Sequence, residues 1–429
     1  PLESSKPNGD IDNFKINKLR NFDDHSTPEY KQEKYSGSFS SLMFFPFVRY
    51  DNYNTSNKFT EKIKPGLYVT SSDMLNRYAI FAGASINSRM ERDLFLQFEY
   101  RNKLPILFNL GIKPEVFLEL YNISRKADVD VLIDEFDPIK TDVTYSLFEF
   151  DIAAKHKFIT SNQNLEFRYI FSSYTATIGS FIFPNSSTLY PTNYDTYFIG
   201  SNFQLTYNAN FELPYIDSDI NPLGGNIELK YNYEMDRYNP DGEYTVEDGT
   251  LVPQYKNFKF HKLELNTEFG MPLWKSHSLY LKLRANTIFG PPIPDFFDSY
   301  LGGLVGMKAY PFYAISGNEL FWMNLTYRFP LFRNIDKQVG HLYIDKIFLS
   351  VYGDFGNAWN TKIPAIKDFK KGAGAELRFA LNSFYLFPTS VFINASYGFD
   401  RVERVVRDEV IKYGKEWRFY GGILFGFEY

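Results

Sequence analysis

One acidic stretch is the densest group of side chains that could do chemistry. "DVDVLIDEFDP" carries Asp128, Asp130, Asp134, Glu135 and Asp137, and Ca²⁺ is bound by several oxygen ligands of this kind. An EF-hand loop also needs a glycine at its sharp turn, whereas here apolar residues separate the acids. The pattern therefore favours an ordinary solvated acidic loop, and we expect no metal there.

The histidines and cysteines give no catalytic or metal-binding pattern either. The chain has no cysteine, which excludes disulfides and thiolate metal sites. Its five histidines are scattered without i,i+4 or metal-ligand spacing: His25, His156, His261, His277 and His341. Those within predicted strands are expected to be lumen or interface residues. We expect no catalytic residue, no cofactor and no enzymatic activity.

The composition indicates a surface that is apolar on alternate residues. Of 429 residues, 19% are aromatic, including 44 Phe and 33 Tyr, yet the mean hydropathy is only -0.32. We find no apolar run of the roughly 18 residues that a membrane helix needs. This combination is typical of a transmembrane β-barrel, whose single strands carry a weak signal. The net charge of -5 gives no support for nucleic-acid binding.

Period-2 alternation runs through the chain from about residue 35. In "LYLKLRAN", for example, Leu279, Leu281 and Leu283 alternate with Lys282 and Arg284. Most runs are long enough to cross a bilayer at a tilt of about 45°. Sixteen runs are recognised, at about 36–49, 65–73, 77–88, 92–102, 106–125, 142–158, 164–176, 196–213, 224–237, 255–271, 276–289, 317–330, 345–358, 372–382, 390–400 and 417–429.

The connections between these runs alternate in length. Those after odd-numbered runs are mostly long, such as 290–316, and those after even-numbered runs are mostly short, such as 272–275; 89–91 and 331–344 fit less well. Outer-membrane barrels are built in this way, with long extracellular loops and short periplasmic turns. The sequence therefore predicts an all-β protein, a 16-stranded antiparallel transmembrane β-barrel over 35–429, in the outer membrane of a Gram-negative-type bacterium.

Residues 1–34 are polar, charged and aperiodic, and they read as a periplasmic tail or linker. A barrel of this kind needs export, yet the sequence starts at Pro1 without a signal peptide. We therefore expect a mature chain or a C-terminal fragment.

The segment around the sixth long connection resembles the Omp85 superfamily, the surface antigen D15 barrels. The family's sixth loop has a glycine pair, a Val/Ile-Arg-Gly-Tyr/Phe tetrad, Gly-Asn, and a strand ending in Tyr-Arg-Phe-Pro. The matching residues here are Gly302 and Gly303; Met307, Lys308, Ala309 and Tyr310; Gly317 and Asn318; and Tyr327 to Pro330. The next strand carries "DFGNAW", Asp354 to Trp359, where the family has Asp-x-Gly-Asn-x-Trp. The resemblance covers 280–429 well and the earlier strands only by pattern.

The resemblance implies that 290–316 folds back into the barrel lumen, where the family's tetrad arginine pairs with an acid on the inner wall. Strand parity places Asp354 and Arg328 on the lumen side, so the implied contact is Lys308 with Asp354. Two residues depart from the family. Lysine at 308 loses the planar fork of arginine, and alanine at 309 adopts a positive φ less readily than glycine.

The two ends of the predicted barrel carry further signals of an outer-membrane protein. The chain ends on Tyr429, with Phe427 and Phe425 on the same face, as in the C-terminal recognition signal of bacterial outer-membrane proteins. The first run contains Pro46, which is tolerated at a seam or strand end. In Omp85 proteins the seam between the first and last strands is weak.

Three functions remain open. The resemblance implies movement or insertion of polypeptide, with membrane lipid and a polypeptide substrate as partners. A plugged barrel could instead anchor an upstream periplasmic domain or an envelope partner, because the start of the chain is similar to barrels that follow a TolB-like propeller. A passive porin is the third. Inward residues of both signs favour a loop-filled lumen over a wide pore: Gln97, Glu99, Arg101, Glu228, Lys230, Lys262, Glu264, Glu268, Lys282, Arg284, Arg328, Glu376 and Arg378.

Overall fold

The chain divides into two units, Pro1–Ser38 and Phe39–Tyr429, and all residues described below belong to the second. The computed structural model describes residues 42–51, 58–75, 77–101, 111–131, 139–182, 189–215, 217–240, 242–247, 250–274, 276–383, 387–406 and 409–425. The predicted tail 1–34 lies outside these residues. No helix among them is long and apolar enough to span a membrane.

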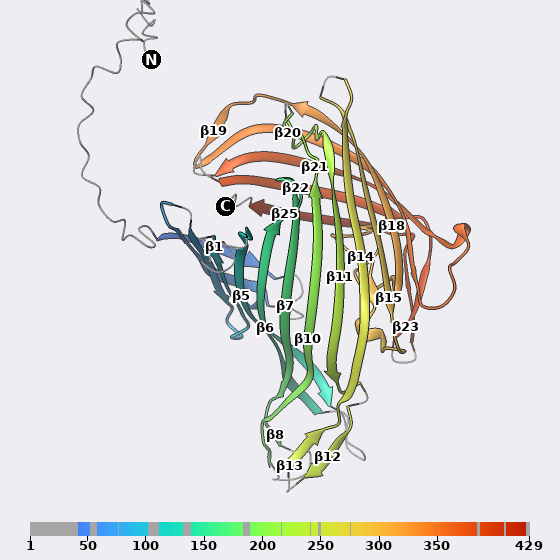
Figure 1. Cartoon of the computed structure of the whole chain (residues 1–429). Coiled ribbons are helices and arrows are strands. Elements are labelled where there is room, and N and C mark those ends of the chain that lie inside the picture. Colours follow the sequence, from blue (N-terminus) through green and yellow to red (C-terminus); the bar gives the residue numbers. More distant parts are fainter. Residues whose placement is uncertain are drawn as a thin grey trace, which may run out of the picture. The chain divides into compact units, whose positions relative to one another are not determined.

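Sixteen long strands in the described ranges follow one another in a single antiparallel sheet, which Figure 1 shows as a curled wall. They are β1 Met43–Tyr50, β2 Ile63–Ser72, β3 Tyr78–Ile86, β4 Arg92–Tyr100, β5 Glu115–Val131, β6 Ile139–Lys157, β7 Gln163–Ile178, β10 Asn193–Asn210, β11 Gly224–Tyr238, β14 Lys256–Pro272, β15 Ser278–Phe289, β18 Glu319–Phe332, β20 Leu342–Trp359, β21 Lys370–Ser383, β22 Phe387–Gly398 and β25 Trp417–Phe425. Each pairs with its neighbour in chain order, and the short β19 Lys337–Val339 extends the ladder beside β20.

The predicted barrel of sixteen antiparallel strands is thereby confirmed. One predicted run was placed wrongly: residues 106–125 were expected to be a strand, but β5 spans Glu115–Val131, while 102–110 lie outside the described part. The alternation of residues continues upstream of the true start, because Leu110 and Ile112 also alternate with polar or small neighbours. Alternation alone therefore cannot locate the beginning of this strand.

The connections differ between the two ends of the sheet. On one side they carry small elements, namely the helix α2 Phe59–Lys62 and the 3-10 turns η3 Asp295–Phe297 and η4 Ile366–Asp368. The same side carries four short strand pairs: β8 Phe181–Ile182 with β9 Leu189–Tyr190; β12 Tyr244–Glu247 with β13 Thr250–Pro253; β16 Ser299–Tyr300 with β17 Ser316–Gly317; and β23 Val402–Val406 with β24 Glu409–Tyr413. Most connections on the other side are shorter turns. The turn at 87–91 on the first side is short, as its sequence indicated.

The two faces of the sheet reverse the polarity of a soluble protein. Apolar side chains such as Leu325 (49% exposed) and Val351 (47%) point outward, whereas Asn324, Ser350 and Glu376 point inward and are buried. An apolar outer face with a polar interior is the arrangement of a transmembrane barrel, whose outer face contacts lipid.

Two groups of aromatic rings on the outer face mark the ends of this apolar zone. At one end of β14, His261 stacks on Tyr233 and Phe289. At the other end, His277 stacks on Trp274 and Phe329. Exposed side chains of the outer face of β14 lie between the two groups: Leu263, Leu265 and Phe269. These groups correspond to the interfacial girdles of membrane barrels, and they account for both histidines as interface residues.

The ladder has two edge strands within the described residues. β1 pairs only with β2, and β25 pairs only with β22. Pro46 lies in the middle of β1, opposite Leu67 of β2. Because proline cannot donate a backbone hydrogen bond, its place in a strand with one neighbour is the tolerated one.

Candidate functional site

The segment 290–316, which we call the sixth loop, lies against the inner face of the sheet. At its start, Phe296 and Phe297 pack on Phe198 of β10 and Tyr238 of β11. Further on, Ser299 accepts a hydrogen bond from Asn286 of β15. These partners are inward-facing side chains, so the sixth loop lies on the polar face of the sheet.

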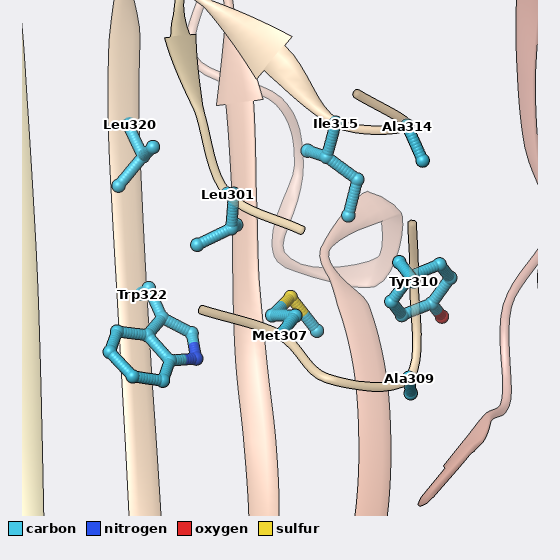
Figure 2. Close-up of a cluster of buried hydrophobic side chains, with 8 residues drawn as sticks. All are labelled: Leu301, Met307, Ala309, Tyr310, Ala314, Ile315, Leu320 and Trp322. Atoms are coloured by element: carbon cyan, nitrogen blue, oxygen red, sulfur yellow. The ribbon is translucent and has the colours of Figure 1, made fainter. Parts of the chain in front are cut away.

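The loop has its own small apolar core, which Figure 2 shows. Leucine, methionine, alanine and isoleucine side chains of the loop pack with two side chains of β18: Leu301, Met307, Ala314 and Ile315 with Leu320 and Trp322. Leu301 and Met307 are fully buried, and a backbone bridge joins Gly302 to Met307. Gly303 has φ +86°, a conformation that side chains other than glycine rarely adopt. The glycine pair therefore makes the tight turn that closes this core.

Tyr310 is fully buried in a socket formed by two glycines. A Cβ added to Gly398 or Gly414 would lie 3.1 or 3.0 Å from its ring. Its hydroxyl donates to the Lys371 carbonyl at 2.9 Å and accepts the Asp400 N–H at 3.1 Å. Burial raises the pKa of this hydroxyl to about 12, so it stays protonated and able to donate at neutral pH. The fourth residue of the tetrad thus fixes the loop to the ends of β21 and β22.

Lys308 forms an ion pair on the inner wall, with Glu376 of β21 at 2.8 Å. Glu376 also accepts a hydrogen bond from Arg378 Nε at 3.0 Å. The ammonium of Lys308 lies 5.0 Å from the centre of the Tyr352 ring of β20. The backbone carbonyl of Lys308 accepts a hydrogen bond from the Tyr420 hydroxyl of β25. The tip of the loop is therefore joined to three strands, β20, β21 and β25.

The structure gives Lys308 a different acidic partner from the implied Asp354, which corrects that contact. Asp354 is buried on the inner face as parity indicated, but its Oδ1 accepts hydrogen bonds from Trp322 (3.0 Å) and Asn324 (2.8 Å) of β18. Glu376 lies opposite Ser350, four residues along β20 from Asp354. Its longer side chain and its place in the register bring it to the ammonium, and no motif in the sequence indicated this.

Ala309 does not have a positive φ, since the non-glycine residues with that conformation in the described ranges do not include it. Its methyl group instead occupies space next to Gly372 of β21, where an added Cβ would lie only 2.9 Å away. The alanine in the tetrad is thus accommodated by a glycine on the wall, and it is fully buried.

The remaining predicted site residues are distributed as follows. Arg328 lies on the inner face, where its guanidinium is 4.4 Å from the centre of the Tyr280 ring rather than beside Asp354. Phe425 is the last residue of β25. Phe427 and Tyr429 lie outside the described residues, so the C-terminal signal stays a prediction.

The acidic stretch at 128–137 is only partly described. Asp128 forms an ion pair with Arg89 at 2.7 Å, and the side chains of the other four acids lie outside the described part. Among the described residues no group of three or more His, Asp or Glu is arranged to hold a metal ion. His156 accepts a hydrogen bond from the Lys113 backbone N–H at 3.3 Å.

The fold has counterparts among solved structures, although no family model and no curated protein matches the chain. CdiB from Escherichia coli is similar at a TM-score of 0.50 and 13% identity, over 89% of this chain and 63% of that chain. This chain shares its β-barrel fold with CdiB. CdiB from Acinetobacter baumannii gives a TM-score of 0.49 and 10% identity, over 90% of this chain and 59% of that chain.

The chain thus spans less than two thirds of the length of either CdiB chain. The copper transporter OprC gives a TM-score of 0.40 at 12% identity, over 83% of this chain and 56% of that chain. At these identities the likeness concerns the fold alone.

The contact between Ala309 and Gly372 can be tested with a disulfide in this cysteine-free chain. The Cβ separation at this pair is below the usual 3.5–4.5 Å of a disulfide, so a small shift of the loop gives bonding distance. We expect Ala309→Cys with Gly372→Cys to oxidise readily in membranes, read as a linked peptide by mass spectrometry. Ala309→Cys with Gly353→Cys is the control, because Gly353 belongs to the outward-facing set of β20. Equal oxidation of both pairs would contradict the loop's position.

The choice between Glu376 and Asp354 as partner of Lys308 can be tested by amine labelling. Glu376→Gln removes a charge-assisted hydrogen bond of roughly 1.5–3 kcal/mol. The side chain of Lys308 is 22% exposed, so solvent weakens the bond and we take its contribution as about 1 kcal/mol. Loss of this contribution should make the labelling of Lys308 about fivefold faster. Asp354→Asn should leave the rate nearly unchanged. If Asp354→Asn accelerates labelling more than Glu376→Gln does, the assignment of the partner fails.

Proposed function

We propose that this protein is an Omp85-type barrel of the outer membrane of a Gram-negative-type bacterium that moves or inserts polypeptide. The proposal rests mainly on the position of the sixth loop. Its tetrad residues Lys308 and Tyr310 contact the inner wall of the sheet. Neither ATP nor a cofactor is required in this mechanism, because the polypeptide would move along the lumen or at the seam.

The two edge strands support a role for the seam. β1 and β25 each have a single partner strand among the described residues, so a further strand could pair with either of them. A strand edge binds an extended polypeptide through main-chain hydrogen bonds. A substrate that arrives as an unfolded β-strand could pair there before it leaves into the lipid.

A plugged barrel that anchors a periplasmic or envelope partner is the second candidate. The apolar core of the sixth loop favours it, because six of its loop residues are buried and Leu301, Met307, Ala309 and Tyr310 are fully so. A loop held in this way could be a permanent plug. A wide passive porin is disfavoured, since contacts of the loop extend along the inner face from β10 to β25.

An insertion assay in lipid vesicles distinguishes the two candidates. The full chain is reconstituted, a urea-unfolded outer-membrane barrel is added, and its folded fraction is followed by gel mobility without heating. We expect faster folding than in protein-free vesicles. The Ala309→Cys, Gly372→Cys variant should slow folding when oxidised and regain the rate on reduction. Rates equal to those of protein-free vesicles would contradict insertion and favour the anchor.

A further inference from the structure

A cavity of about 440 Å³ lies between the sixth loop and the inner wall. Its volume falls within the range of about 300–1,000 Å³ that is typical of small-molecule sites. The loop contributes Leu304, Val305, Gly306 and Lys308, and the wall is formed by side chains of β15, β18, β20 and β21. The cavity therefore exists only because the loop is seated on these strands.

Positive charge prevails in the lining. Four cations, Lys282, Lys308, Arg328 and Arg378, face two acids, Asp354 and Glu376. An excess of one sign inside a cavity with low-dielectric walls concentrates ions of the opposite sign. The lining thus favours an anionic occupant.

Two of the three carboxylates near the cavity form ion pairs with its cations. Glu376 is shared between Lys308 and Arg378. Lys282 pairs with Glu268 at 2.7 Å. Asp354 receives hydrogen bonds on Oδ1 from two side chains of β18. The other oxygen of Asp354, Oδ2, is buried without a hydrogen-bond partner, and no ion pair joins this carboxylate to the fourth cation among the described residues.

Arg328 is that cation. Within the described residues no carboxylate forms an ion pair with it, and its guanidinium donates to the Asp219 carbonyl at 3.3 Å. One face of the guanidinium is covered by the Tyr280 ring at 4.4 Å. A guanidinium has five N–H donors in a planar fork that matches the oxygens of carboxylate and phosphate groups. Its donor capacity therefore exceeds the contacts that the described part of the protein supplies.

Arg378 is placed to act with Arg328. Arg328 lies opposite Ser350 of β20, and Ser350 lies opposite Glu376 of β21. Arg378 is two residues beyond Glu376 on the same face, so the two guanidinium groups approach one cavity from strands on either side of β20. Glu376 lies in the row between them and pairs with Arg378, so Arg328 is the guanidinium of the two that no carboxylate pairs with among the described residues.

We propose that this cavity is a binding site for an oxyanion, a phosphate or carboxylate group, with Arg328 as the principal ligand and Arg378 and Lys308 as supporting cations. Ser350, which also lines the cavity, can donate a hydroxyl hydrogen bond to the same anion. Because Lys308 belongs to both the site and the loop anchor, an occupied site favours the seated loop.

Calorimetric titration of the full chain in an uncharged detergent tests the proposal. The two probes are inorganic phosphate and dihexanoyl phosphatidic acid, because they distinguish a free anion from a lipid headgroup. Both are titrated at the same ionic strength, and the titrations are repeated at higher salt. We expect saturable binding of at least one probe that weakens as salt rises. Arg328→Gln should weaken it about tenfold or more, because a charge-assisted, forked contact is lost.

Two further variants separate binding from folding. Arg328→Lys keeps the charge but loses the fork, and it should retain part of the affinity. Arg101→Gln is the matched control: Arg101 pairs with Glu99 of β4, outside the lining of the cavity. It should bind like the unaltered chain. Absence of binding by both probes, or binding that Arg328→Gln leaves unchanged, would overturn the proposal.

Discussion

The inward face of the strands carries charged and polar groups, and the sixth loop is held there by an ion pair with one of them and by hydrogen bonds to backbone groups. Lys308 reaches Glu376, and Tyr310 satisfies backbone groups at the ends of β21 and β22. Without these contacts Glu376 would keep only Arg378 as a cationic partner. Gly398 and Gly414 would lose the Tyr310 ring that packs against them. The position of the loop is therefore the condition on which the Lys308–Glu376 pair, the cavity and the proposed function all depend.

Much of the fold could be predicted because a lipid-facing sheet leaves a simple signature. Alternation indicates which side of each strand faces lipid, as the exposed Leu325 and the buried Asn324 confirm. The start of β5 could not be predicted, since the alternation continues upstream of Glu115 without a break. The boundaries at 317 and 345 were correct within a few residues, since β18 begins at Glu319 and β20 begins at Leu342.

The candidate site was only partly visible in the sequence. The motif located the loop, and parity placed Asp354 on the inner face. The acid that pairs with Lys308 depends on the register between β20 and β21, and the sequence of one strand does not determine that register. The role of Gly372 could not be predicted either, because in the sequence nothing distinguishes it from other strand glycines. Only the structure shows that Ala309 packs beside it. The two departures from the family tetrad are thus matched on the wall: the flexible lysine reaches Glu376, and the alanine methyl fits against a residue without a side chain.

Single-channel conductance in planar bilayers tests most directly whether the sixth loop fills the lumen. The unaltered chain should show small, unsteady currents, and replacing residues 304–310 by a short glycine linker should give larger and steadier ones, because the plug is removed while the strands remain. A wide, steady current from the unaltered chain, unchanged by this replacement, would contradict the account.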